Sequence, residues 1–277
     1  MPYGVGNRTG QVGRDEGAAI LNRAWEAGLN CLDTAIGYGE SELRLGALGI
    51  ERWRVITKLP AVPDSCGDVR EWVQNEVSGS LNRLKVSRLY GLLLHCPHQL
   101  KSAAGASLYQ ALASLKAQGK IDKLGVSIYE PVELESLLPR FKIDLVQAPF
   151  SIVDRRIDTS GWLRRLKSAG IEVHVRSIFL QGLLLMTTEA RPAAFSQWRC
   201  LWERWQEWLA AQSLTPLQAC LRFALSQSGI DRVVVGVDSL GQLEEILASS
   251  AGTVAPPPRE LMSEDLNLVN PSRWKRV

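Results

Sequence analysis

The sequence predicts an α/β protein of parallel strands joined by helices, and within that class a (β/α)8 barrel. Seven short apolar segments, typical of strands buried on both faces, alternate with longer amphipathic segments typical of helices. Such repeats form right-handed strand–helix–strand units. A doubly wound sheet is the alternative, but no Gly-x-Gly-x-x-Gly follows any strand. The barrel is therefore favoured, as one domain of residues 1–277 in which seven of eight strands can be found.

The predicted strands are rich in leucine or β-branched residues, and most lie beside Gly, Pro or Asp. They are expected at residues 29–35, 53–59, 89–96, 123–129, 143–150, 171–178 and 231–237.

The predicted helices have apolar residues at helical spacing and recognisable end signals. Gly28 suits the end of the first helix and Asp68 the N-cap of the second. Thr215 followed by Pro216 suits the start of the fourth. The helices are expected at residues 14–28, 68–85, 102–120, 215–229 and 241–250.

An aromatic segment at residues 195–212 fits no strand–helix repeat. Its large apolar residues recur at helical spacing. An aromatic stripe of this kind more often packs against other parts of the protein than contacts a ligand, so packing is predicted. It follows a strand end, on the face where barrel active sites lie. The residues concerned are Phe195, Trp198, Trp202, Trp205 and Leu209.

The composition excludes several classes of protein. The chain is 45 % hydrophobic and 22 % charged, and its net charge is +3. The one cluster of basic residues in the sequence lies at residues 273–276. This cluster is too short to indicate nucleic-acid binding. No apolar run reaches the length of a membrane span, and no signal peptide is recognisable. Five cysteines without a Cys-x-x-Cys predict neither a disulfide frame nor a zinc site, so the expected location is the cytoplasm.

Polar residues stand where three predicted strands end. Asp33, Lys58 and His95 end the first three strands, and Tyr38 lies in the loop after Asp33. Because the carboxyl ends of barrel strands open on one face, we expect these four side chains to converge. An ammonium near a phenol favours phenolate and lowers the phenol's pKa, and a carboxylate can hold that ammonium. The set suits general acid–base chemistry on a C–O bond.

Each residue also has a simpler interpretation. Lys58 could be a solvated strand-end lysine, His95 a histidine of the core, and Asp33 the cap of the following turn. The combination of four complementary groups favours the catalytic interpretation.

At this point the sequence resembles a known family. "GLNCLDTAIGYGESELRLG" (28–46) resembles the aldo-keto reductase signature G-x-x-x-x-D-T-A-x-x-Y-G-x-x-E-x-x-x-G. "VITKL" and "LLLHCP" resemble the family's lysine and histidine motifs, and "LGVSIY", "DLVQAPFS" and "RSIFLQGLL" follow in its order. The resemblance runs from about residue 3 to residue 250. It implies a (β/α)8 barrel oxidoreductase that acts on small carbonyl substrates with NADPH, less often NADH.

The resemblance also implies roles for the strand-end residues. Tyr38 would be the general acid for carbonyl reduction, with Lys58 lowering its pKa and Asp33 anchoring Lys58. His95 would orient the carbonyl group. A cofactor-binding sensor, or a non-catalytic member of the same fold, is the main alternative, and an unrelated (β/α)8 isomerase or lyase is a third.

The cofactor residues follow from the same resemblance. Ser127 and Gln147 would bind the nicotinamide carboxamide, and Arg176 stands where the family often has an aromatic residue on the nicotinamide. The pyrophosphate would be lined by Ser177, Leu180, Gln181 and Gly182.

The last cofactor motif departs from the family pattern. Asp238 stands where relatives often have a basic residue for the 2′-phosphate of NADPH, while Ser239 could still donate to a phosphate. NADPH is therefore the expected cofactor, with NADH as a second candidate.

Two further expectations concern a metal and the missing strand. His98 lies near His95 and Cys96, but Pro97 breaks the spacing and no carboxylate is near in sequence, so no metal is expected. In relatives a segment like "YGVGNRTG" follows the first strand, so we expect that strand upstream of Met1. Residues 1–13 would then be irregular and lie near the active-site face, and the strands at 29–35 and 231–237 would flank the gap.

Overall fold

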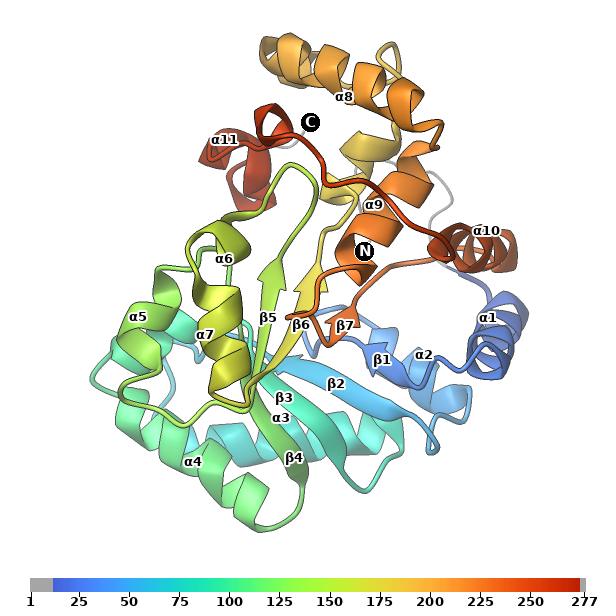
Figure 1. Ribbon diagram of the computed structural model, residues 1–277. Helices are drawn as coiled ribbons and strands as arrows, with labels where there is room; N and C mark the ends of the chain where they lie inside the picture. Colours follow the sequence, from blue (N-terminus) through green and yellow to red (C-terminus); the bar gives the residue numbers. More distant parts are fainter. Residues whose placement is uncertain (1–11, 275–277) are drawn as a thin grey trace. The chain divides into compact units, whose positions relative to one another are not determined.

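A sheet of seven parallel strands, in chain order β1 to β7, forms the framework of the computed structural model, which describes residues 12–274 (Figure 1). The predicted number of strands is confirmed. Residues 1–11, including most of the predicted irregular start, lie outside the described residues. The strands are β1 (Cys31–Asp33), β2 (Arg54–Leu59), β3 (Leu89–Leu94), β4 (Ile121–Ser127), β5 (Leu145–Pro149), β6 (Glu172–Arg176) and β7 (Arg232–Val233).

The last strand is much shorter than predicted. The sequence predicts a strand at 231–237, but β7 covers Arg232–Val233 and pairs with β6 through His174 and Val175. Val234 still donates to the carbonyl of Val175 at 2.8 Å, after which the chain leaves the ladder. Its side chains are only partly buried, so a continuous apolar run overstates the length of this strand.

The chain divides into two compact units, each described here by itself. One contains Gly13–Ala148 and Leu166–Val173, and the other contains Pro149–Arg165 and most of the chain from His174 onward. A single barrel domain stays a prediction.

In the first unit, helices α3 and α4 pack beside each other, α3 against β2 and α4 against β4 (Figure 1). Asp68 caps α3 as predicted, because its carboxylate accepts from the backbone N–H groups of Arg70 and Glu71. Ile56 on β2, Leu93 on β3 and Leu145 on β5 form a fully buried cluster. The helices of this unit are α1 (Arg14–Glu26), α2 (Ser41–Ala47), α3 (Val69–Leu84), η1 (Pro97–Lys101), α4 (Gly105–Ala117) and α5 (Glu133–Leu137).

In the second unit, α9 packs against α10, β7 and the 3-10 segment η2. Thr215 begins α9 with a complete capping box to Gln218, as its sequence signals predict. The sequence did not indicate some of the helical elements in this part of the chain. One of them, α7, has residues in both units. The helical elements are α6 (Arg156–Thr159), α7 (Trp162–Ser168), η2 (Leu180–Leu185), η3 (Ala193–Trp198), α8 (Arg199–Gln212), α9 (Pro216–Leu225), α10 (Leu240–Ser250), η4 (Arg259–Leu261), α11 (Leu266–Val269) and η5 (Pro271–Arg273).

The aromatic segment packs as predicted. It forms most of η3 and all of α8, and its stripe is the buried face except at Trp198, which is only partly buried. Phe195, Trp202, Trp205 and Leu209 are each at most 4 % exposed. None of the helices in residues 12–274 is long and apolar enough to cross a membrane.

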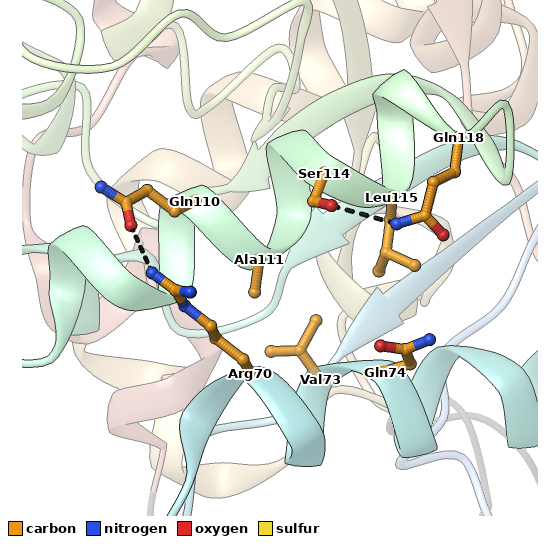
Figure 2. Close-up of a pocket in the computed structure, with 8 residues that line it drawn as sticks. All are labelled: Arg70, Val73, Gln74, Gln110, Ala111, Ser114, Leu115 and Gln118. Carbon is orange, nitrogen blue, oxygen red and sulfur yellow. Dashed lines mark hydrogen bonds between the residues drawn. The ribbon is translucent and has the colours of Figure 1, made fainter.

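A pocket lies between α3 and α4 (Figure 2). Arg70 donates to Gln110 across it, and Gln118 donates to Ser114 along α4. None of the predicted site residues lines this pocket. Its lining is Arg70, Val73, Gln74, Gln110, Ala111, Ser114, Leu115 and Gln118.

Helix α2 depends on a close approach to the end of α3. A Cβ atom added at Gly46 would lie 2.1 Å from the carbonyl oxygen of Arg83 and 2.9 Å from the carbonyl carbon of Leu84. These are backbone atoms, which cannot give way as a flexible side chain can. Glycine at position 46 therefore sets how near α2 lies to α3.

Gly46→Ala is expected to lower the free energy of unfolding by about 3 kcal/mol, at the upper end of the usual range for overpacking. Urea unfolding followed by circular dichroism measures it. Gly67→Ala is the control, because nothing lies within 4 Å of a Cβ atom at that position. Equal stability of the two variants would contradict the proposed role of the close approach.

Candidate active site

A buried ion pair joins the ends of the first two strands. The ammonium of Lys58 donates to Oδ1 of Asp33 and to the carbonyl oxygen of Thr34, the latter at 3.0 Å. Lys58 is 1 % exposed, and the side chain of Asp33 is 14 % exposed. A buried charge is tolerated when it is paired and its remaining hydrogen-bonding groups are satisfied. The pairing expected from the sequence is therefore present.

Tyr38 and His95 lie beside this pair. The Nζ atom of Lys58 lies 5.4 Å from the centroid of the Tyr38 ring. The Tyr38 and His95 rings meet edge to face, with centroids 5.8 Å apart. Both residues are partly exposed, whereas Lys58 is not. The structure thus brings together the four residues predicted for catalysis.

The path of the chain from β1 to Tyr38 follows the neighbouring strand. Beyond Asp33, the N–H groups of Thr34 and Ile36 donate to the carbonyls of Ile56 and Lys58. The N–H of Tyr38 then donates to the carbonyl of Ala35 at 3.0 Å, which closes a turn. Tyr38 is therefore placed by backbone bonds to the strand that carries the lysine.

Gln147 is connected to the same carboxylate. Its Nε2 donates to Oδ2 of Asp33 at 2.7 Å, so Asp33 binds Lys58 with one oxygen and Gln147 with the other. Ser127 is the register partner of Gln147 on the adjacent strand β4, and both residues are at most 3 % exposed. The sequence predicted Gln147 as a cofactor residue but not its bond to Asp33.

One atom of Gln147 fits the cofactor that the resemblance implies. Its Oε1 is buried and has no hydrogen-bond partner in the part of the chain that the structure describes. An unsatisfied buried acceptor is uncommon and costly. The amide N–H2 of a nicotinamide carboxamide is a donor of the required kind, so the residues present fit a nicotinamide cofactor.

The predicted pyrophosphate residues form an unusual turn in the second unit. Ser177, Leu180 and Gln181 have φ angles of 60°, 47° and 55°, and Gly182 has 94°. The hydroxyl of Ser177 accepts from Gln181 at 3.3 Å and lies 3.5 Å from Nη1 of Arg176. Runs of backbone N–H groups in turns with left-handed residues can form anion-binding concavities.

Asp238 and Ser239 form the N-terminus of α10. The Ser239 hydroxyl accepts from the N–H of Gln242 at 3.2 Å, and the Gln242 side chain accepts from the N–H of Asp238 at 2.8 Å. Ser239 therefore serves as the helix cap. The aspartate stands at the start of the helix, where the family often has a cation.

A second buried carboxylate, Glu42 on α2, was not assigned a role from the sequence. Its Oε1 accepts from the hydroxyls of Thr57 and Ser80 at 2.7 Å each, and its Oε2 binds Arg83 at 2.8 Å. Glu42 is 1 % exposed. It ties the helix after Tyr38 to β2 and to α3. The glutamate of the signature motif was the available signal.

The segment after His95 offers little for a metal ion. Among residues 12–274 no group of three or more His, Cys, Asp or Glu residues is arranged to hold one. Burial raises the pKa of the Cys96 thiol, and the charge of Glu133 raises it further. Both causes oppose formation of the thiolate, the form that binds metals.

The signature, the strand-end residues and the parallel sheet all point to the same family, and a family model decides the matter. The model described as "Aldo/keto reductase family" matches residues 3–255. The chain belongs to the aldo-keto reductase family. It is thus an NAD(P)-dependent enzyme, and the family resemblance of the sequence is confirmed.

Curated relatives of this aldo-keto reductase are distant. It is 25 % identical to the D-threo-aldose 1-dehydrogenase of a Pseudomonas species, over 87 % of this chain and 85 % of that protein. It is 26 % identical to the NADH-specific methylglyoxal reductase of Escherichia coli K12, over 87 % and 84 %. It is also 26 % identical to the L-galactose dehydrogenase of Arabidopsis thaliana, over 88 % and 81 %.

Solved structures agree on the fold. The holo form of an aldo-keto reductase from Bacillus halodurans matches with a TM-score of 0.73 at 21 % identity, over 88 % of this chain and 85 % of that one. The apo form matches with a TM-score of 0.71 at 22 % identity, over 90 % and 85 %. The predicted (β/α)8 fold class is thereby confirmed. The roles of individual site residues stay predictions.

Glu42→Gln is expected to lower the free energy of unfolding by about 3–5 kcal/mol, because an amide facing Arg83 leaves a partly buried cation without its counter-charge. Urea unfolding measures it.

Glu40→Gln is the matched control, since Glu40 forms an exposed pair with Arg44 one turn along the same helix. Such surface pairs contribute about 0–1 kcal/mol. A loss at Glu42 no larger than the loss at Glu40 would show that the buried network does not stabilise the fold.

Proposed function

We propose that this enzyme reduces an aldehyde or ketone to an alcohol, or catalyses the reverse reaction, with Tyr38 as the general acid. The observation that carries the proposal is the buried Lys58–Asp33 pair beside the Tyr38 ring. Reduction places negative charge on the carbonyl oxygen, and a positioned hydroxyl can protonate it. Tyr38 is partly exposed and so can be reached by a substrate.

The neighbours of Tyr38 support this role in different ways. The Lys58 ammonium stabilises negative charge on the phenol oxygen when its proton has left. Asp33 and the Thr34 carbonyl keep that ammonium in place. The edge-to-face contact places His95 next to the phenol, where its ring can donate to the carbonyl oxygen.

Ser127 and Gln147 would bind the carboxamide of the cofactor's nicotinamide. The Oε1 atom of Gln147 would accept a hydrogen bond from this carboxamide, and the 2.7 Å bond from Nε2 to Asp33 fixes the orientation of the side-chain amide. The reduced nicotinamide supplies a hydride to the carbonyl carbon when it is bound. Asp33 would thus orient both Gln147, which binds the cofactor, and Lys58, which acts on the phenol of Tyr38.

The remaining cofactor contacts are proposed for the second unit. Arg176 would stack on the nicotinamide through its planar guanidinium. The turn that includes Ser177, Leu180 and Gly182 would bind the pyrophosphate through backbone N–H groups, and Ser239 would face a phosphate at the start of α10.

The cofactor preference is proposed as NADPH with appreciable use of NADH. The family favours NADPH, but the carboxylate of Asp238 repels a 2′-phosphate and can accept from a ribose hydroxyl. The relative named as an NADH-specific reductase shows that related chains can use NADH.

The substrate is proposed to be a small carbonyl compound, and a sugar aldehyde or a dicarbonyl such as methylglyoxal is the first choice for testing. Three relatives are named for such compounds. The cytoplasm is proposed as the location, in keeping with cysteines that are all free.

Tyr38→Phe is expected to lower kcat about 10²- to 10⁴-fold, as loss of a general acid does, while cofactor affinity stays within about twofold. Turnover is measured with methylglyoxal and an aldose panel, and affinity by fluorescence titration.

Tyr109→Phe makes the same chemical change on α4, where that hydroxyl bonds the Lys142 backbone, and it should leave turnover unchanged. If Tyr38→Phe keeps more than about a tenth of the wild-type turnover, Tyr38 is not the acid. A wild type that binds cofactor but turns over no carbonyl would favour a cofactor-binding sensor instead.

Asp238→Arg is expected to tighten NADPH binding about tenfold or more, because a charge-assisted contact replaces repulsion, and to leave NADH nearly unchanged. Fluorescence titration of both cofactors measures this difference. Glu245→Arg changes the net charge equally on the same helix and controls for the general field. The same gain in both variants would show that Asp238 does not face the 2′-position.

A further inference from the structure

The turn at residues 177–182 is strained and therefore needs support. Three of its non-glycine residues, Ser177, Leu180 and Gln181, have φ angles between 47° and 60°. Side chains with a Cβ atom rarely adopt this left-handed region. Such conformations persist only where the surrounding structure holds them.

Two side chains from later in the chain bind the backbone that continues this turn. The indole N–H of Trp205 donates to the carbonyl of Leu184 at 3.2 Å. The guanidinium of Arg191 donates to the carbonyls of Leu183 and Met186 at 3.3 and 3.0 Å. Carbonyls at the end of a helical segment lack partners within it, so these donors satisfy three such carbonyl groups at the end of η2 and at its C-cap.

Both donors are buried, and one of them is charged. Trp205 is fully buried and Arg191 is 9 % exposed. The guanidinium lies 4.2 Å from the centroid of the Trp202 ring, and its Nη1 has no hydrogen-bond partner among residues 12–274. The charge of the exposed Glu189 acts on this guanidinium, but no ion pair joins the two among residues 12–274, and burying a cation that is not directly paired is costly. A packing role alone would be met at lower cost by an apolar side chain.

We propose that Arg191 and Trp205 are positioning residues that hold the 177–182 turn in its cofactor-binding form. The inference rests on the proposed function, in which this turn binds the pyrophosphate. The aromatic segment then has a purpose beyond packing: α8 presents an indole N–H to the backbone that follows the turn, and Trp202 supports the guanidinium that binds beside it. Neither donor needs to touch the cofactor.

Trp205→Phe tests the proposal, because it removes the N–H donor and keeps an aromatic ring. We expect the Kd of NADPH to rise about 3- to 10-fold, the effect of one lost hydrogen bond transmitted to the turn. The Kd of ADP-ribose, which has the pyrophosphate but no nicotinamide, should rise by the same factor. Reduced nicotinamide mononucleotide lacks the pyrophosphate, and its Kd should stay within about twofold. All are measured by fluorescence titration or competition.

Trp198→Phe is the matched control. Its indole also donates one hydrogen bond, at 3.1 Å, but to Asp265 and not to the turn. It should leave all three dissociation constants unchanged. Arg191→Lys is the second variant, which keeps the positive charge but loses the planar guanidinium. It should weaken the binding of NADPH and of ADP-ribose. If Trp205→Phe does not fold, this variant provides the test.

The outcomes separate this inference from the proposed function. A wild type that binds neither NADPH nor NADH would overturn the proposed function, and the inference with it. A wild type that binds cofactor, with folded variants whose affinity for ADP-ribose is unchanged, overturns the inference alone. An equal loss of affinity for ADP-ribose and for the mononucleotide also overturns it, because that pattern indicates a general structural effect.

Discussion

The ion pair between Lys58 and Asp33 is the constraint on which the rest of the candidate site depends. A lysine at 1 % exposure must be compensated, and the compensation comes from the end of the neighbouring strand. Parallel pairing with residue-by-residue register makes this contact available, because β1 and β2 end on the same side. Asp33 then has one oxygen left, and Gln147 from β5 binds it. One carboxylate therefore links three strands, and with them the lysine proposed for catalysis and the glutamine proposed to bind the cofactor.

The chain between Asp33 and Glu42 explains why a tyrosine so soon follows a buried carboxylate. Thr57 and Lys58 are adjacent on β2, so their side chains leave opposite faces of the strand. Asp33 binds Lys58 and Glu42 binds Thr57, and thus the segment is fixed to both faces of one strand. Tyr38 lies midway between these two fixed points. Buried polar contacts on either side therefore hold the segment that carries it.

Much of this could be predicted from the sequence because it depends on short-range patterns. Apolar runs ended by Asp33, Lys58 and His95 indicated both the strands and the residues at their ends. The caps at Asp68 and Thr215 were predicted from local signals that the structure confirms. The strand at 231–237 was predicted too long, since valines favour a strand whether or not a second partner continues the ladder.

The parts that escaped prediction are contacts between residues far apart in sequence. Nothing in "DLVQAPF" indicates that Gln147 donates to Asp33, 114 positions earlier. An amide and a carboxylate can each form hydrogen bonds with many other groups, so their sequence does not select this partner. The same holds for Glu42 and Arg83, which meet only because α2 lies against α3 at Gly46.

The turn at 177–182 shows most clearly what could not be predicted from the sequence. Its sequence favours no left-handed residue other than glycine. The side chains that bind the backbone after it lie 5 to 21 positions from the carbonyls they reach, and Trp205 belongs to an aromatic segment whose spacing indicates only a helix. A strained conformation of this kind is determined by what surrounds it. Residues that support such a turn are therefore found by following the hydrogen bonds of the carbonyls beside it, and not from the turn's own sequence.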